Sequence, residues 1–200
     1  MKAVILTPYH EKAFEKDLIY GADLIICADS AYVEARRHGI AADVIIGDFD
    51  HDGLPAAEGG NVITVPSEKD DTDTMLCIKY AIDAGTDEII IAGGIGGRLD
   101  HTVANLQSLA YAQSHGVKAS ITDGQNTAYM ISKAAMIPYK PHSYLSLFAY
   151  GGAAGGVSVS GVRYPLDNAE LTADFPLGVS NEIVDDFAKI EVKSGRLLIV

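Results

Sequence analysis

The sequence predicts an α/β protein whose N-terminal part forms a parallel sheet covered by helices and whose C-terminal part is entirely β. As far as Gly124, short apolar runs alternate with longer amphipathic runs, which is the pattern of parallel strands joined by helices. Beyond Gly124, apolar and polar residues alternate with a period of two, and turn dipeptides separate the runs. We therefore predict two domains, residues 1–125 and 126–200, with the join in the region 124–140.

The apolar runs of the first part predict its strands, and the amphipathic runs between them predict its helices. Strands are expected at residues 3–6, 24–27, 44–46, 62–65, 88–92 and 118–122. Helices are expected at residues 30–38, 72–84 and 99–114, where apolar residues recur three and four positions apart. Glycine follows each helical run, at Gly39, Gly85 and Gly116, where a left-handed C-terminal residue is favoured.

The second part shows the alternation of half-buried strands. Alternating runs predict strands at residues 144–148, 157–160 and 189–193, and the apolar residues 197–200 predict a final strand. Turn dipeptides, among them Gly151-Gly152 and Ser194-Gly195, separate these runs. The glycine-rich stretch 151–156 favours a hairpin connection over a phosphate-binding loop.

The charge balance argues against polymeric nucleic acid as a partner. Fifteen Lys and Arg residues against 27 Asp and Glu residues give a formal net charge of -12. Such a protein repels a phosphate backbone, although divalent metal ions can bridge its carboxylates to the phosphates of a small ligand. The balance therefore favours metal-bridged small ligands.

The cysteines and the N-terminus predict an intracellular setting. Cys27 and Cys77 lie in apolar runs without a neighbour at metal-ligand or redox spacing, so we expect buried, inert thiols. The N-terminal apolar run is too short for a signal peptide, and no run is long enough to cross a membrane. We expect a cytoplasmic protein.

Aspartates follow most strands of the first part at the point where each strand should end. They are Asp29, Asp48, Asp50, Asp70, Asp71, Asp73 and Asp100. Because parallel strands end at one edge of their sheet, at least five carboxylates should converge on one cleft. Each alone fits a turn or a helix N-cap, but together they require a compensating cation. Carboxylate ligands favour Mg²⁺, and His101 has no partner at zinc-ligand spacing.

A glycine run at residues 93–97 follows a predicted strand and opens onto a helix, so its backbone amides can approach phosphates. The run does not match GxGxxG, since Leu99 stands at the third glycine position, and the chain has no P-loop motif. An ordinary tight turn would also explain the run. Arg98 is placed to bind a phosphate, with a surface ion pair as its alternative role.

Several motifs in order resemble those of thiamine pyrophosphokinases. They are Ala28-Asp29-Ser30, Gly47-Asp48-Phe49-Asp50, Lys69-Asp70-Asp71-Thr72-Asp73, the run from Gly96 to His101, the runs 161–166 and 178–182, and the closing run 195–200. The resemblance covers nearly the whole chain. It implies an N-terminal Rossmann-like α/β catalytic domain that binds ATP and Mg²⁺. It also implies a C-terminal β-sandwich domain that binds thiamine, in a homodimer with thiamine near the subunit interface.

The resemblance also implies residue roles. Asp71, Asp73 and Asp100 match the family's magnesium and catalytic carboxylates, and Arg98 would stabilise the transferring group. Ser180 and Asn181 match positions that contact the thiamine pyrimidine. The further residues expected to contact ATP or metal are Asp29, Ser30, Asp48, Asp50, Lys69, Thr72, Gly94, Gly97 and His101.

Two departures from the family pattern stand out. His51 replaces a serine that often follows the GDFD motif, and the chain has no tryptophan to stack on the substrate. A tyrosine such as Tyr164 would supply an aromatic face instead.

The expected reaction is attack of the thiamine hydroxyl on the β-phosphorus of ATP, with AMP as leaving group and Asp100 or Asp71 as the base. Two alternatives stay open: the same transfer to another alcohol, such as a hydroxymethylpterin, and a sensor that binds without turnover. The complete aspartate set argues against the sensor, and Ser180-Asn181 favours thiamine over the pterin.

Overall fold

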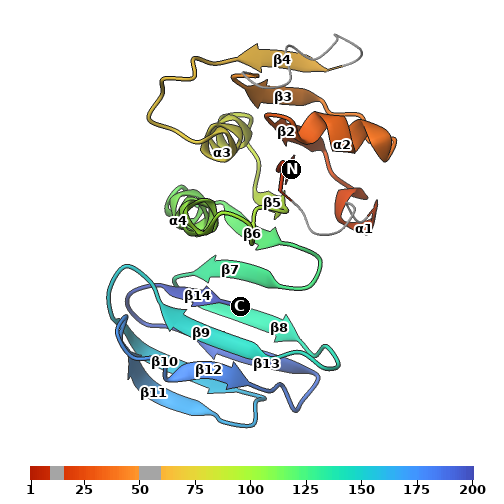
Figure 1. Cartoon of the computed structure of the whole chain (residues 1–200). Helices are drawn as coiled ribbons and strands as arrows, with labels where there is room; N and C mark the ends of the chain where they lie inside the picture. Colours follow the sequence, from red (N-terminus) through yellow and green to blue (C-terminus); the bar gives the residue numbers. More distant parts are fainter. Residues whose placement is uncertain (10–15, 50–59) are drawn as a thin grey trace. The chain divides into compact units, whose positions relative to one another are not determined.

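A computed structural model describes residues 1–9, 16–49 and 60–200 of the chain. The fold is mixed α/β and consists of two compact units, Met1–Thr127 and Ala128–Val200, which are described separately below (Figure 1). Asp50 and His51 lie outside the described residues.

The described residues of the first unit form six strands, and neighbouring strands pair in parallel. They are β1 (Lys2–Leu6), β2 (Leu24–Ala28), β3 (Val44–Gly47), β4 (Asn61–Thr64), β5 (Glu88–Ala92) and β6 (Lys118–Thr122). The order is β6-β5-β1-β2-β3-β4. The predicted parallel pairing is confirmed. Strand β1 lies between two partners and is buried from Ala3 to Leu6, as its uninterrupted apolar sequence requires.

In the parts of this unit that the structure describes, the helices are α1 (Lys16–Ile19), α2 (Ala31–Arg37), α3 (Asp73–Asp83) and α4 (Leu99–Ser114). Figure 1 shows α1 and α2 on one side of the sheet and α3 and α4 on the other. The three longer helices match the predicted ranges, whereas the short α1 was not predicted. Helix α3 begins after Thr72, whose hydroxyl accepts a hydrogen bond from the Met75 amide at 3.2 Å and caps the helix.

The second unit is antiparallel. One group of strands has the order β12-β9-β14-β7, and the other has the order β11-β10-β13-β8. The strands are β7 (Thr127–Ile131), β8 (Ala134–Pro138), β9 (Leu145–Ala149), β10 (Ala154–Ser160), β11 (Leu166–Leu171), β12 (Gly178–Asn181), β13 (Phe187–Glu191) and β14 (Leu197–Ile199). Three predicted alternating runs and the final strand are present, whereas β7, β8, β11 and β12 were not predicted.

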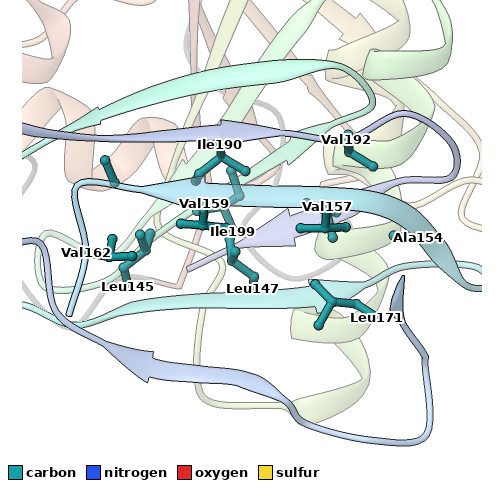
Figure 2. Packing of buried hydrophobic residues seen from close by; sticks show 12 residues of the cluster. Leu145, Leu147, Ala154, Val157, Val159, Val162, Leu171, Ile190, Val192 and Ile199 are labelled. Atoms are coloured by element: carbon teal, nitrogen blue, oxygen red, sulfur yellow. The ribbon is translucent and has the colours of Figure 1, made fainter. Parts of the chain in front are cut away.

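Both strand groups of the second unit contribute to one apolar core (Figure 2). Leu147 and Ile199 come from one group, and Val157, Val159 and Ile190 come from the other. All five side chains are at most 3% exposed. Along β13, buried Ala188 and Ile190 alternate with exposed residues, which explains the period of two in that part of the sequence.

Among the described residues, no helix is both long enough and apolar enough to span a bilayer.

Candidate active site

The carboxyl ends of β2 and β3 bring two sequence motifs into contact. Asp29 follows β2 with a positive φ of 45°, and its amide donates a hydrogen bond to the Ile46 carbonyl at 2.7 Å. A Cβ atom at Gly47 would lie only 2.8 Å from the Asp29 Cα and 3.0 Å from its Oδ1. Glycine before Asp48 is therefore required for Asp29 to lie at this edge of the sheet.

Lys69 joins the next two aspartates of the same edge. Its Nζ donates a hydrogen bond to Asp48 Oδ2 at 3.1 Å and lies 2.9 Å from Asp73 Oδ1. The three side chains are only 15 to 26% exposed. We call Lys69, Asp48 and Asp73 the Lys69 cluster. One protein cation thus serves two partly buried carboxylates.

The electrostatics of the Lys69 cluster favour a positive charge beside Asp48 and Asp73. Burial raises the pKa of Asp73, and the charges of Asp29 and Asp48 raise it further, while Lys69 opposes the shift. For Lys69 itself, burial opposes the charged form, but Asp73 and Asp48 outweigh it and raise the pKa of the ammonium. The buried Asp73 Oδ1 receives no aligned hydrogen bond from any described residue. Its remaining acceptor capacity is what a metal ion or a protonated ligand would use.

Asp71 is held by a different base. Its Oδ2 accepts a hydrogen bond from Lys79 Nζ at 2.7 Å, and this interaction raises the pKa of Lys79. Lys79 Nζ also lies 5.9 Å from the centroid of the Tyr111 ring, which belongs to α4. The Lys79 ammonium therefore links Asp71 to Tyr111 of α4.

Asp100 pairs with Arg98 at the start of α4. Arg98 Nη2 donates to Asp100 Oδ2 at 2.6 Å, and Arg98 Nε donates to Asp100 Oδ1 at 3.1 Å. This hydrogen bonding lowers the pKa of Asp100. Both side chains are largely exposed, at 72% for Arg98 and 66% for Asp100. The ion pair predicted as the alternative role of Arg98 is present, and such an exposed pair can open at little cost to bind an anion.

The three expected metal ligands, Asp71, Asp73 and Asp100, are each paired with a base of this chain. Within the described residues, no group of three His, Cys, Asp or Glu side chains lies close enough together to hold a metal ion. The oxygen donors nevertheless suit Mg²⁺, and Asp73 Oδ1 is the buried one among them, with the Lys69 ammonium 2.9 Å away. The magnesium assignment stays a prediction.

The glycine loop, residues 93–97, follows β5 and leads into α4. Gly93, Gly94, Gly96 and Gly97 all have positive φ values, between 61° and 91°. Most other residues would be strained in this conformation, which explains the run of glycines. The amides of Gly97 and Arg98 lie at the N-terminal end of α4 and donate to no described residue.

Three residues that sequence reasoning did not single out fix this loop. The Gly94 amide donates to the Tyr9 carbonyl at 2.7 Å, and Asn105 Nδ2 donates to the Gly94 carbonyl at 2.8 Å. The hydroxyl of Thr102 accepts from the Gly96 amide at 3.0 Å. Tyr9 follows the end of β1, so the rule applied to the aspartates would also have selected its segment. In the sequence, Asn105 and Thr102 differ from their neighbours only in being polar residues of an amphipathic helix, which does not indicate that they fix the loop.

The remaining expected ATP contacts lie at helix starts. Ser30 precedes α2 without capping it, Thr72 caps α3, and His101 lies in the first turn of α4. The His101 amide donates to Asp100 Oδ1 at 2.9 Å.

In the second unit, Asn181 holds the segment around Tyr164. Its Oδ1 accepts from the Tyr164 amide at 3.0 Å and the Glu182 amide at 2.9 Å, while its Nδ2 donates to the Tyr164 carbonyl at 2.8 Å. Ser180 has a φ of 60°, and its amide donates to Ser146 Oγ at 3.1 Å. Tyr164 is 62% exposed. Asn181 thus supports an exposed tyrosine, a role that the sequence motif did not indicate.

Comparison with family models matches both parts of the chain. Residues 16–121 match the model described as thiamin pyrophosphokinase, catalytic domain. Residues 135–197 match the model described as thiamin pyrophosphokinase, vitamin B1 binding domain.

Individual proteins give the same picture. A thiamine pyrophosphokinase of Bacillus subtilis is 29% identical over 136 residues, covering 67% of this chain and 64% of the relative. Thiamine pyrophosphokinase 2 of Arabidopsis thaliana is 25% identical over 178 residues, covering 80% and 66%. The matches therefore span less than two thirds of these relatives' lengths.

Solved structures share the fold. The thiamine pyrophosphokinase structure from Bacillus subtilis aligns with a TM-score of 0.90 and 26% identity, covering 100% of this chain and 97% of that one. The Candida albicans thiamin pyrophosphokinase aligns with a TM-score of 0.83 and covers 99% and 87%; at 16% identity this supports the fold alone.

Proposed function

The chain belongs to the thiamine pyrophosphokinase family, and from this membership we propose that it transfers the pyrophosphoryl group of ATP to the hydroxyl of thiamine. The products are thiamine pyrophosphate and AMP. The single observation that carries the proposal is the order of the two matched segments: a catalytic match over residues 16–121 is followed by a vitamin B1 binding match over residues 135–197.

The acidic edge of the first unit supports this chemistry. Burial raises the pKa of Asp73, and the nearby charges of Asp29 and Asp48 raise it further. Lys69 compensates Asp48 and Asp73. A polyphosphate brings more negative charge to such a site, so the transfer requires a cation between ligand and protein.

In this proposal Asp71, Asp73 and Asp100 would hold Mg²⁺ in place of their present basic partners, and the ion would neutralise charge on the phosphates of ATP. The thiamine oxygen forms a bond to the β-phosphorus, and the bond from that phosphorus to the oxygen shared with the α-phosphate breaks. The electron pair leaves with AMP, and the hydroxyl proton goes to a carboxylate, either Asp100 or Asp71. Arg98 releases Asp100 and donates its hydrogen bonds to a phosphate oxygen instead.

The other expected ATP contacts keep their proposed roles. The glycine loop receives phosphates at its free amides, with Gly94 and Gly97 giving close backbone approach. Residues at the sheet edge and at the helix starts contact the nucleotide or a second ion: Asp29, Ser30, Asp48, Asp50, Lys69, Thr72 and His101.

For thiamine we propose the second unit, with Ser180 and Asn181 near the pyrimidine. Because the Asn181 amide already makes three hydrogen bonds to the Tyr164 segment and to Glu182, its contribution would be to hold Tyr164 in place. The Tyr164 ring then supplies the aromatic face that tryptophan gives elsewhere. We further propose that the protein is a cytoplasmic homodimer. Its first domain is Rossmann-like, and its second domain is sandwich-like.

The test is incubation of purified protein with ATP, Mg²⁺ and thiamine, and a parallel reaction without thiamine, with chromatography of AMP and thiamine pyrophosphate. Equal amounts of both products are expected, and only when thiamine is present. AMP without thiamine pyrophosphate, or no AMP, would contradict thiamine as acceptor. Hydroxymethylpterin is then the next substrate to try, and binding without turnover would identify a sensor.

A further inference from the structure

Tyr9 is tied to the end of β5 through its backbone. Thr7 is only 2% exposed, and its amide donates to the Ala92 carbonyl at 3.1 Å. The Thr7 hydroxyl lies within hydrogen-bond distance of both the Ala92 carbonyl, at 3.1 Å, and the Tyr9 carbonyl, at 3.3 Å. The Tyr9 carbonyl also accepts from the Gly94 amide at 2.7 Å. The segment after β1 therefore fixes the start of the glycine loop.

The Tyr9 ring lies against the other end of the same loop. A Cβ atom at Gly97 would come within 2.7 Å of ring atom Cε2, and one at Gly96 would come within 3.0 Å of Cε1. A Cβ at Gly93 would come within 2.3 Å of the Tyr9 carbonyl oxygen. Three of the four loop glycines thus leave room for this one residue, in addition to adopting positive φ.

The ring is not part of the hydrophobic core, because Tyr9 is 40% exposed. At Gly96 and Gly97 the Tyr9 ring covers backbone, since glycine has no side chain. The contacts of this ring therefore restrict the part of the chain with the greatest conformational freedom, since glycine loses more backbone entropy on ordering than any other residue. A loop that is ordered before ligand arrives binds that ligand more tightly.

We propose that Tyr9 is a positioning residue that holds the glycine loop in the conformation that receives the phosphates of the nucleotide. This inference rests on the proposed function for the identity of the ligand. Tyr9 acts through the loop: its carbonyl fixes Gly94, and its ring fixes Gly96 and Gly97. The ring, rather than the hydroxyl, makes the contact with Gly97.

The first test compares Tyr9→Ala and Tyr9→Phe with Tyr20→Ala as matched control. Tyr20 is a tyrosine of the same unit with 86% exposure. Tyr9→Ala should raise the KM for ATP about tenfold while changing kcat and the KM for thiamine by less than about twofold. Tyr9→Phe and Tyr20→Ala should resemble wild type. An unchanged KM for ATP in Tyr9→Ala, or equal loss in Tyr9→Phe, would overturn the proposal.

Hydrogen exchange of the substrate-free protein separates this inference from the proposed function. Peptides covering residues 93–98 should exchange faster in Tyr9→Ala than in wild type or Tyr9→Phe, whatever reaction the protein catalyses. If wild type forms no thiamine pyrophosphate, the proposed function fails, and the exchange result still decides whether Tyr9 orders the loop. Unchanged exchange in Tyr9→Ala overturns the inference.

A double-mutant cycle tests the ring contact directly. Gly97→Ala places a methyl group against the Tyr9 ring, so its Tm loss should be at least halved in a Tyr9→Ala background. The backbone strain at the φ of 61° is common to both backgrounds and cancels. Equal Tm losses in the two backgrounds would show that the ring does not rest on Gly97 and would overturn the proposal.

Discussion

Lys69 Nζ lies 2.9 Å from Asp73 Oδ1, and the same ammonium donates to Asp48 Oδ2 at 3.1 Å. A single lysine therefore separates two carboxylates that would otherwise repel one another at the edge of the sheet. The proposed reaction places a metal ion at this edge, so Lys69 provides the compensating charge in the protein without ligands.

Removal of that charge should make stability depend on magnesium. Lys69→Met should lower the unfolding free energy at low salt by about 1–2 kcal/mol, because Asp48 and Asp73 lose their shared partner. Added Mg²⁺ should then raise the Tm of the variant more than that of wild type. Thermal unfolding across a Mg²⁺ titration measures both effects.

Lys69→Arg is the matched control, since it keeps the positive charge. It should show a magnesium response close to that of wild type. Equal responses of Lys69→Met and wild type would contradict a cation site at these carboxylates.

Asp71 should be needed for turnover rather than for folding. Asp71→Asn should lower kcat at least ~100-fold, since the amide neither holds Mg²⁺ well nor accepts a proton. Circular dichroism should show an intact fold, because Asp71 is a partly exposed residue ahead of α3.

Lys79→Met distinguishes the carboxylate from its ion pair. This variant loses the 2.7 Å contact to Asp71 but keeps the carboxylate, so kcat should fall by less than about tenfold. If both variants lose activity equally, the ion pair rather than the carboxylate is what catalysis needs.

Two glycines with the same backbone conformation allow the contact with Asn105 to be measured. Gly94 has a φ of 78° and Gly116 a φ of 79°, but a Cβ at Gly94 would lie 2.6 Å from Asn105 Nδ2, whereas one at Gly116 meets nothing within 4 Å. Gly116→Ala should cost about 1 kcal/mol from strain alone. Gly94→Ala should cost about 1–3 kcal/mol more and reduce ATP binding.

Denaturant unfolding measures the difference in stability between the two variants. ATP binding should weaken in Gly94→Ala but not in Gly116→Ala, because Gly116 follows the far end of α4. Similar losses of stability in the two variants would mean that Asn105 moves aside freely and does not fix the loop.

The parallel strands and three helices were predictable because long apolar and amphipathic runs report burial directly. Helix α1 is only four residues long, too short to show a period. In the second unit, exposed residues such as Met136 and Phe187 weaken the alternation.

For the site, the sequence predicted which edge of the sheet carries the aspartates but not which base each one meets. The pairs Asp71–Lys79 and Asp73–Lys69 depend on side-chain directions that strand ends do not encode. For the same reason the role of Tyr9 was not predicted: Tyr9 follows β1 and Gly97 precedes α4, so the two residues in contact are far apart in the sequence. The expected pyrimidine contact of Asn181 stays a prediction, and the sequence did not show that its amide also holds the Tyr164 backbone.

Arg98 should matter for the reaction but not for stability. Its pair with Asp100 is largely exposed on both sides, and such pairs contribute little to folding. Arg98→Gln should leave the Tm unchanged while lowering kcat at least ~10-fold, because a positive charge near the transferring group is lost. Lys189→Gln is the control, since it breaks a similarly exposed pair with Glu191 in the second unit. Full turnover in Arg98→Gln would mean that Arg98 only forms its surface ion pair with Asp100 and does not take part in the transfer.

The turn after β6 should make a pH-dependent contribution to stability. Partial burial opposes ionisation of Asp123, but hydrogen bonds from Asn126 and Gln125 outweigh it and lower the pKa of the carboxyl. A carboxyl whose pKa is lower in the folded protein stabilises the fold above its unfolded pKa of about 4, and this contribution is lost as the pH falls through the folded value.

Asp123→Asn should therefore lower the unfolding free energy by about 1 kcal/mol at pH 7, and the difference from wild type should disappear as the pH falls below the pKa of Asp123 in the folded protein. Gln125→Ala is the control, because Gln125 donates through its backbone amide, which the variant keeps. Denaturant unfolding at several pH values measures the profile. A difference that stays constant with pH would mean that the shape of the Asp123 side chain, and not its charge, holds the turn.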